Sequence, residues 1–411
     1  MSAQTQPRRL FPAAGSPGLL RYGLFGLWLL AAVIGAIGVG QRILLGDRLA
    51  AYTSYIPWGL WVAAYIFFVG LSAGAFLLSS LGYAFGLRRF ESIGPLALLT
   101  AAVTLIMGLL MILVDLGHPE RFVEVFVRPQ LRSMMAWIGW LYTAYFVLLL
   151  GMLVLALQSR VVHLDPGRVR RNDRWLRRLS TIGVPLAIAF PGASGALFGT
   201  VIAREYWNTA LFPIIFLAGA LLSGGALVTA IVVFLWPRRD GTWKELVTAL
   251  TRIVLALLVV QSILEFAEIT IPAWYQIGSE ASLVNSVLFG PYWYVFWLVH
   301  GLLGVVIPLI LLTRSSLAAR GVGAALVAVT FLAVRLNLVI PGLITPELQG
   351  LERAYLDPIG GRLSYAYLPS LFEWQVVIGV LAIGAALFYL GYRFLPLVGT
   401  DSEDLREDVA R

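Results

Sequence analysis

The stretch GPLALLTAAVTLIMGLLMILVDLGHPERF, residues 94–122, decides the fold class. Its first part, 94–115, is apolar and about 20 residues long, which is the length that a helix needs to cross a bilayer core. The run then ends in Asp115, which is followed by a glycine, a histidine, a proline and a Glu-Arg pair. The stretch therefore predicts a lipid-spanning helix that ends in a cluster of titratable groups.

The composition extends this interpretation to the whole chain. Its 411 residues are 59% hydrophobic and 13% charged, whereas an average soluble domain has about 25% charged residues. The apolar runs are continuous and do not alternate, which excludes a membrane β-barrel. We predict an all-α polytopic membrane protein with about ten transmembrane helices, at residues 20–40, 58–86, 94–115, 133–157, 179–200, 210–236, 246–270, 293–313, 317–341 and 373–395.

The predicted helices form one integral membrane domain over residues 1–411. Small residues recur at 70–74 and 221–225, an offset of about 151 residues. A parallel repeat of this kind predicts two four-helix bundles, with the first and last helices at the periphery. The acidic segment 396–411 is predicted to be a cytoplasmic tail.

The distribution of cations predicts the orientation. Of the 30 lysines and arginines, 20 fall on the side of both termini and 8 on the other side, and residues 160–178 carry seven of them. Cytoplasmic loops retain such cations, so both termini are predicted to be cytoplasmic and Asp115 to face outward. The net charge of +8 is then a topology signal, and we expect contact with membrane lipid and no nucleic-acid partner.

The absence of cysteine excludes cysteine-ligated iron–sulfur clusters and disulfides in this chain. Of the three histidines, His118, His163 and His300, only the last lies inside a predicted helix. A bis-histidine haem needs two facing histidines in the membrane. We therefore predict no haem and name no metal ligands, so electrons that pass through this subunit need a mobile organic carrier.

Three ionisable residues, Glu265, His300 and Arg335, fall inside predicted helices at nearly the same depth. At about 1.5 Å per residue, Arg335 lies roughly 9 Å inside the hydrocarbon. Gln261 and Glu268 share a helical face with Glu265, because their spacing is i, i+4 and i+7. Ionisable groups cost several kcal/mol in hydrocarbon unless they are paired or hydrated, which makes them functional candidates.

Two interpretations of this polar layer remain open. Arg335 and Glu265 form an ion pair that only holds helices together, or the layer surrounds a hydrated pocket that exchanges protons with a ligand. In the second interpretation Asp115 lines the mouth of the pocket.

Several motifs carry a family resemblance. The combination of PWGLW (57–61), GLSAG (70–74) and DLGHPERF (115–122) resembles the NrfD-like family of polysulphide reductase membrane subunits. YLPS (367–370) and EW (373–374) resemble the ten-helix branch that anchors molybdopterin oxidoreductases and the membrane-bound type-2 hydrogenase. The resemblance covers essentially the whole chain and departs at His118, where the family pattern has arginine.

The resemblance implies a haem-free anchor subunit in the bacterial inner membrane that binds menaquinone or ubiquinone near the outer face. It also implies electron exchange with a ferredoxin-like iron–sulfur subunit, which in turn joins a molybdopterin or hydrogenase catalytic subunit. The chain would then belong to an oxidoreductase complex without being catalytic alone.

Two-electron quinone chemistry moves two protons, so titratable side chains are required beside the ring. The candidate catalytic residues are Asp115, Glu265, Glu268 and His300. The candidate quinone-binding residues are Tyr55, Trp58, Ser72, Gly74, His118 and Arg335.

Two alternatives belong to other functional classes. The same intramembrane charges suit a secondary transporter or an ion-translocating subunit, although broken helices near the midplane are expected there. A passive anchor would need the polar layer to be fully paired and dry. The cytoplasmic halves of the predicted helices carry no carboxylate, so we expect that this subunit alone does not pump protons.

Overall fold

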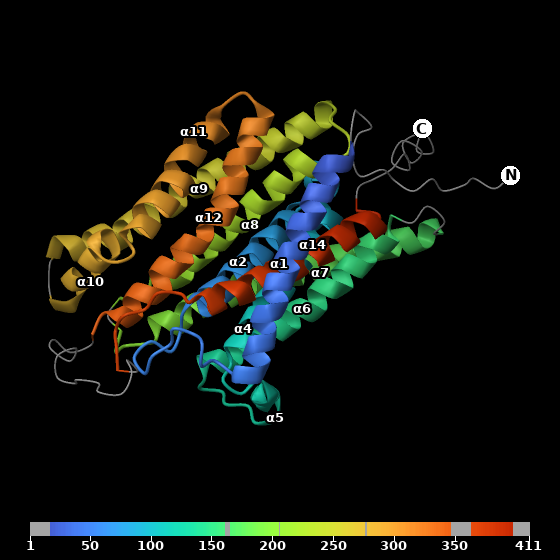
Figure 1. Ribbon diagram of the computed structural model, residues 1–411. Coiled ribbons are helices and arrows are strands. Elements are labelled where there is room, and N and C mark those ends of the chain that lie inside the picture. The colour runs from blue at the N-terminus through green and yellow to red at the C-terminus, as the bar shows by residue number, and fades with distance from the viewer. Residues whose placement is uncertain (1–16, 161–164, 205, 276–277, 347–362, 398–411) are drawn as a thin grey trace.

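The computed structural model describes residues 17–160, 165–204, 206–275, 278–346 and 363–397, and these form a bundle of long helices (Figure 1). Within these residues, ten helices are long and apolar enough to cross a membrane, which confirms the predicted fold class. They are α1 (Pro17–Leu45), α2 (Leu60–Tyr83), α4 (Gly94–Asp115), α6 (Met134–Gln158), α7 (Pro166–Gly199), α8 (Phe212–Leu235), α9 (Gly241–Tyr275), η2 with α11 (Val295–Val306 and Ile307–Thr313), α12 (Leu317–Ile344) and α14 (Leu371–Phe394).

Short helices connect the spans. They are α3 (Arg88–Glu91), η1 (Pro119–Arg121), α5 (Glu124–Val127) and α10 (Gly278–Phe289), and the sequence interpretation contained none of them. The predicted tail 396–411 lies almost wholly outside the described residues.

Helix α7 begins well before its predicted start at residue 179. Its N-cap is Asp165, whose side chain accepts a hydrogen bond from the Gly167 amide, and its first turns are rich in arginine. An apolar run marks only the part of a helix that lies in lipid. The helix can continue into water with polar residues, which hydropathy does not detect.

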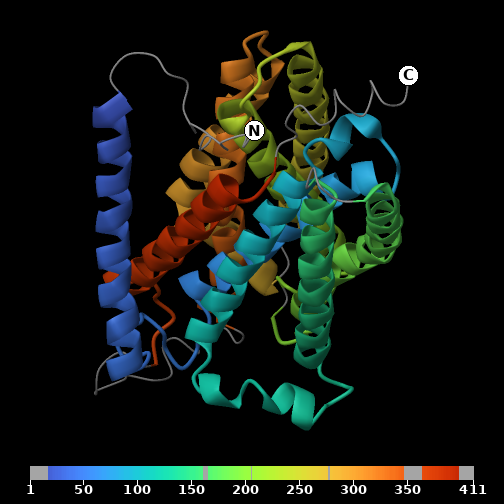
Figure 2. The same cartoon turned by 90° about the vertical axis from the view of Figure 1, so that its right-hand side faces the viewer.

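The spans pack in two sets of four. Helices α2, α4, α6 and α7 contact one another, and so do α8, α9, α12 and the η2–α11 helix. Helix α1 packs on α14 at the edge of the molecule (Figure 2). The two sets also contact each other, because α8 packs on α2 and on α7, and α14 packs on α4 as well as on α1.

The two small-residue stretches meet where α2 crosses α8. A Cβ atom on Gly74 would lie 2.1 Å from the carbonyl oxygen of Ala220, and one on Gly224 would lie 2.6 Å from the Cα of Gly74. Small residues permit such close backbone contact between membrane helices. The prediction that Gly74 binds a cofactor is therefore corrected, because backbone of α8 fills the space beside it.

Ser72 has a similar packing role. Its hydroxyl donates to the carbonyl of Ala101 on α4 at 2.8 Å and lies 3.2 Å from the hydroxyl of Tyr145 on α6. The side chain is fully buried. We correct the prediction that Ser72 binds a cofactor, since its hydrogen bonds join three helices of the first bundle.

Candidate functional site

A chain of polar side chains joins α9 to η2. His300 Nε2 lies 2.8 Å from Glu265 Oε2, and Gln261 Nε2 donates to Glu265 Oε1 at 2.8 Å. The side chains of His300 and Glu265 are only 13% and 17% exposed. Partners on both carboxylate oxygens reduce the cost of holding a charge inside the bundle.

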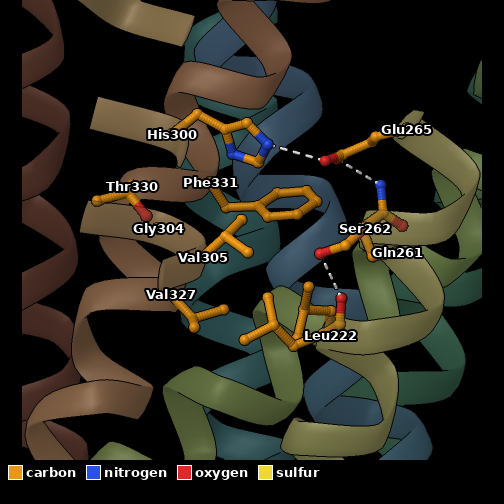
Figure 3. Close-up of a pocket in the computed structure, with 11 residues that line it drawn as sticks. Leu222, Gln261, Ser262, Glu265, His300, Gly304, Val305, Val327, Thr330 and Phe331 are labelled. Atoms are coloured by element: carbon orange, nitrogen blue, oxygen red, sulfur yellow. Dashed lines mark hydrogen bonds and ion pairs between the residues drawn. The ribbon is translucent and has the colours of Figure 1, made fainter. Parts of the chain in front are cut away.

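His300 lies in the middle of a π-helix, Val295–Val306. Such segments are rare and frequently occur at functional sites, and the apolar pattern of this run does not predict one. The segment also contains Gly304, on which a Cβ atom would lie 2.7 Å from the Thr330 hydroxyl of α12. The π-helix therefore packs closely on α12 while His300 reaches α9 (Figure 3).

One cavity among the described helices, which we call the shallow cavity, lies near the end of the bundle that carries Asp115. Its empty volume is about 490 Å³, a figure that includes the open solvent at its mouth. Its polar lining comes from Tyr206, Glu265, Glu268, His300 and Asn337. Its apolar lining comes from Phe212, Ile215, Ile269, Val287, Phe296, Val334 and Leu338.

The second cavity, which we call the deep cavity, has an empty volume of about 230 Å³ and room for about one water molecule. Figure 3 shows His300, Glu265 and Gln261 at one end of it, and Leu222, Val305 and Val327 toward the other. Glu265 and His300 line both cavities. The pair therefore belongs to the walls of both a more open cavity with a mixed lining and a more enclosed cavity whose far end is apolar.

Arg335 lies behind this pair and is 1% exposed. Its guanidinium carbon sits 4.5 Å from the ring centre of Phe216 and 5.0 Å from that of Phe331. Within the described chain its Nε and Nη1 atoms have no hydrogen-bond partner.

The proposed Arg335–Glu265 ion pair is not formed, because the described residues give the two side chains no contact within 4 Å. The Glu265 oxygens bond to His300 and Gln261 instead. Arg335 attracts Glu265 only through space, and it is not among the residues that line either cavity.

Asp115 belongs to a separate polar cluster and lines neither cavity. The Tyr52 hydroxyl donates to Asp115 Oδ1 at 2.7 Å. Burial raises the pKa of Tyr52 well above its usual value, and the charge of Asp115 raises it further. The expectation that Asp115 lines the mouth of the Glu265 pocket is therefore corrected.

The neighbourhood of this cluster also includes Tyr367, whose hydroxyl donates to Glu373 Oε1 at 2.6 Å and accepts from the Leu60 amide at 2.7 Å. Glu373 is fully buried and forms a capping box with Ser370 at the start of α14. These bonds tie the start of α14 to the start of α2.

The remaining candidates lie outside the cavities. Tyr55 stacks on Tyr365 at 4.4 Å between ring centres, and Trp58 stacks on Trp207 at 5.9 Å. The His118 side chain is 65% exposed and its Nδ1 lies 2.9 Å from Glu120. These contacts give Tyr55 and Trp58 a role in packing the loops and place His118 on the surface.

Sequence reasoning missed two polar residues of the shallow cavity, Tyr206 and Asn337. The Tyr206 hydroxyl donates to the backbone carbonyl of Asn337 at 3.3 Å. Burial raises the pKa of Tyr206, followed by the charges of Glu268 and Glu265, so its hydroxyl stays protonated. An amide two residues after Arg335 in an apolar helix was a usable signal for Asn337, whereas a tyrosine in a loop carries none.

Residues 49–347 match the family model described as polysulphide reductase, NrfD. The chain belongs to the NrfD family. It is 34% identical to a selenate reductase subunit of Mesobacillus selenatarsenatis, with 90% of this chain and 93% of the relative covered.

Two further relatives are named as membrane subunits. A putative dimethyl sulfoxide reductase membrane subunit of Halobacterium salinarum is 31% identical, and the comparison covers 94% of each chain. The Hdr-like menaquinol oxidoreductase integral membrane subunit of Archaeoglobus fulgidus is 27% identical, with 91% of this chain and 93% of the relative covered. This NrfD protein is therefore similar to membrane subunits over nearly its full length.

Proposed function

We propose that this NrfD protein is the haem-free, quinone-reactive membrane subunit of a respiratory oxidoreductase complex. The observation that carries the proposal is the Glu265–His300 pair, which lies on the wall of an open cavity between membrane-spanning helices. A relative named for menaquinol oxidation supports a quinol as the ligand. The chemistry of the cavity lining supports such a ligand, because it combines apolar side chains with acidic groups, an imidazole and an amide.

A quinone or quinol in the shallow cavity supplies two-electron, two-proton chemistry. Glu265 is the proton acceptor on the cavity wall. The proton that Glu265 takes up is shared with His300 across their 2.8 Å contact. Gln261 holds the other carboxylate oxygen in place. Glu268, which lines the same cavity, is a second group that can take up a proton.

The electron partners are proposed from the relatives. The named relatives are membrane subunits of reductases with different substrates, so this chain is proposed to serve as an anchor and to leave the terminal reaction to another subunit. We propose that electrons pass to or from a ferredoxin-like iron–sulfur subunit at the end of the bundle that carries Asp115. A molybdopterin or hydrogenase subunit would complete the complex.

The proposed location is the bacterial inner membrane with both termini in the cytoplasm. The support is the excess of lysine and arginine on the side of the termini. A fluorescent protein fused after Arg411 should mature in the cytoplasm and fluoresce. Activity of alkaline phosphatase, an enzyme that folds in the periplasm, when fused at the same position would show that the orientation is the opposite one.

The central experiment is to purify the complex and measure quinone extracted per mole of this subunit, together with binding of added menadione. We expect about one bound quinone, and weaker binding when Phe296→Trp narrows the shallow cavity. A wild-type complex without binding would overturn the proposal.

Proton movement across sealed vesicles beyond the stoichiometry of quinone chemistry would favour the alternative, an ion-translocating subunit.

A further inference from the structure

Asn337 has a buried donor that the protein leaves unused. The residue is 7% exposed, and its Nδ2 atom has no hydrogen-bond partner in the described chain. An unsatisfied buried amide costs about 1 to 3 kcal/mol, and native proteins keep few such groups. Asn337 also lines the shallow cavity, so a turn of its amide group toward the cavity, which exchanges the positions of Nδ2 and Oδ1, lets a ligand there supply the missing acceptor.

The backbone at Asn337 is held firmly in place. Tyr206 donates to its carbonyl oxygen, and the buried Trp207 Nε1 donates to the carbonyl of Leu338 at 2.9 Å. Two bonds from one loop therefore fix this turn of α12. The backbone that carries the Asn337 side chain therefore needs no rearrangement, and only the amide group has to turn when a ligand binds.

The two carboxylates of the cavity lining are of the opposite kind. Glu265 and Glu268 are carboxylates and accept hydrogen bonds when ionised. Carboxylates suit the hydroxyls of a quinol, whereas the carbonyl oxygens of an oxidised quinone need donors. His300 Nε2 already faces Glu265, and the Tyr206 hydroxyl donates to backbone.

We propose, on the basis of the proposed quinone site, that Asn337 Nδ2 donates a hydrogen bond to a carbonyl oxygen of the oxidised quinone. Asn337 thereby favours the quinone form over the quinol form. The carboxylates on α9 favour the quinol, so the relative affinity of the two redox forms depends on this residue.

The test measures, by equilibrium dialysis, how tightly the purified complex binds menadione and its reduced form, menadiol. The menadiol measurements are made under strict anaerobiosis. In Asn337→Leu we expect about five- to tenfold weaker binding of menadione, the range that one lost hydrogen bond gives. Menadiol affinity should change by less than about twofold. Asn337→Asp keeps the side-chain shape but lacks the amide donor, so it should show the same selective loss of menadione affinity. This second variant still tests the proposal if the leucine variant does not fold.

The matched control is Thr251→Val. Thr251 is also buried and its hydroxyl also has no described partner, but it lies 14 residues before Glu265 on α9, about 21 Å along the helix. Thr251→Val should leave the affinities for menadione and for menadiol unchanged. Equal losses for the two redox forms, or no loss, would overturn the Asn337 proposal alone. A wild-type complex that binds neither form would overturn the quinone site as well.

Discussion

His300 Nε2 and Glu265 Oε2 lie 2.8 Å apart although the two residues are separated by 35 positions and belong to different helices. Both side chains line the shallow and the deep cavity. The pair is therefore placed to exchange a proton with a ligand in either cavity.

Replacing the carboxylate should impair chemistry more than assembly. Glu265→Gln keeps the side-chain shape but removes the charge and the capacity to take up a proton. We expect quinol oxidation per assembled complex to fall about 100-fold or more, as is usual when a general base is lost. Glu245→Gln, an exposed position on the same helix, is the control. A wild-type rate in Glu265→Gln with normal assembly would contradict the proton-transfer role.

The pair should act as a unit. We expect His300→Gln to slow quinol oxidation about as much as Glu265→Gln, and the double variant to be little slower than either single variant. Residues that share one proton show such non-additive effects. Steady-state rates of the three variants, normalised to assembled subunit, measure the coupling. Multiplicative losses would mean that the two side chains work independently.

Removing the buried charge of Arg335 should lower the activity without lowering the stability of the protein. Arg335→Met has an apolar side chain that fits between Phe216 and Phe331 and removes a group whose burial costs several kcal/mol. We expect an apparent Tm in detergent equal to or above that of the wild type. Quinol oxidation should slow, because Glu265 loses the nearby positive charge. Arg335→Lys keeps the charge and should retain more activity. A methionine variant that fails to assemble would reveal a structural partner for the arginine.

Changes at Asp115 should have smaller effects than changes at Glu265. Asp115 lines neither cavity, and Asp115→Asn still offers an oxygen to the Tyr52 hydroxyl. We expect less than a tenfold loss of quinol oxidation. Tyr52→Phe, which removes the 2.7 Å bond, should lower stability by about 1 to 2 kcal/mol. A loss at Asp115 equal to that at Glu265 would show that both clusters serve the same reaction.

The crossing of α2 and α8 should tolerate no side chain at Gly74. A Cβ there would meet the Ala220 carbonyl at 2.1 Å, so Gly74→Ala should destabilise the bundle by about 1 to 3 kcal/mol through overpacking. The measurement is the yield and Tm of folded protein. Gly151→Ala, at a position with no heavy atom within 4 Å, should fold normally. Normal stability of Gly74→Ala would mean that the two helices separate easily.

The sequence by itself determined the class of the protein. In lipid a backbone must satisfy its hydrogen bonds internally, so the number and length of the apolar runs predict an all-α protein with ten spans, as observed. Hydropathy also placed Glu265 and His300 at a similar depth, because depth follows from the count of residues along each helix. Those two residues do meet.

Tertiary structure alone decided which polar groups share a cavity. The depth of a residue in the membrane does not specify how its helix is rotated about its axis or which helix lies beside it. The sequence of a nearly uniformly apolar helix gives little information on its rotation or on its neighbour. For this reason the sequence groups Asp115 with Glu265 although Asp115 pairs with Tyr52. It likewise leaves open an ion pair of Arg335 with Glu265, whereas the guanidinium lies against the rings of Phe216 and Phe331. The π-helix around His300 and the free amide of Asn337 likewise depend on contacts with neighbouring helices, which form only when the bundle packs.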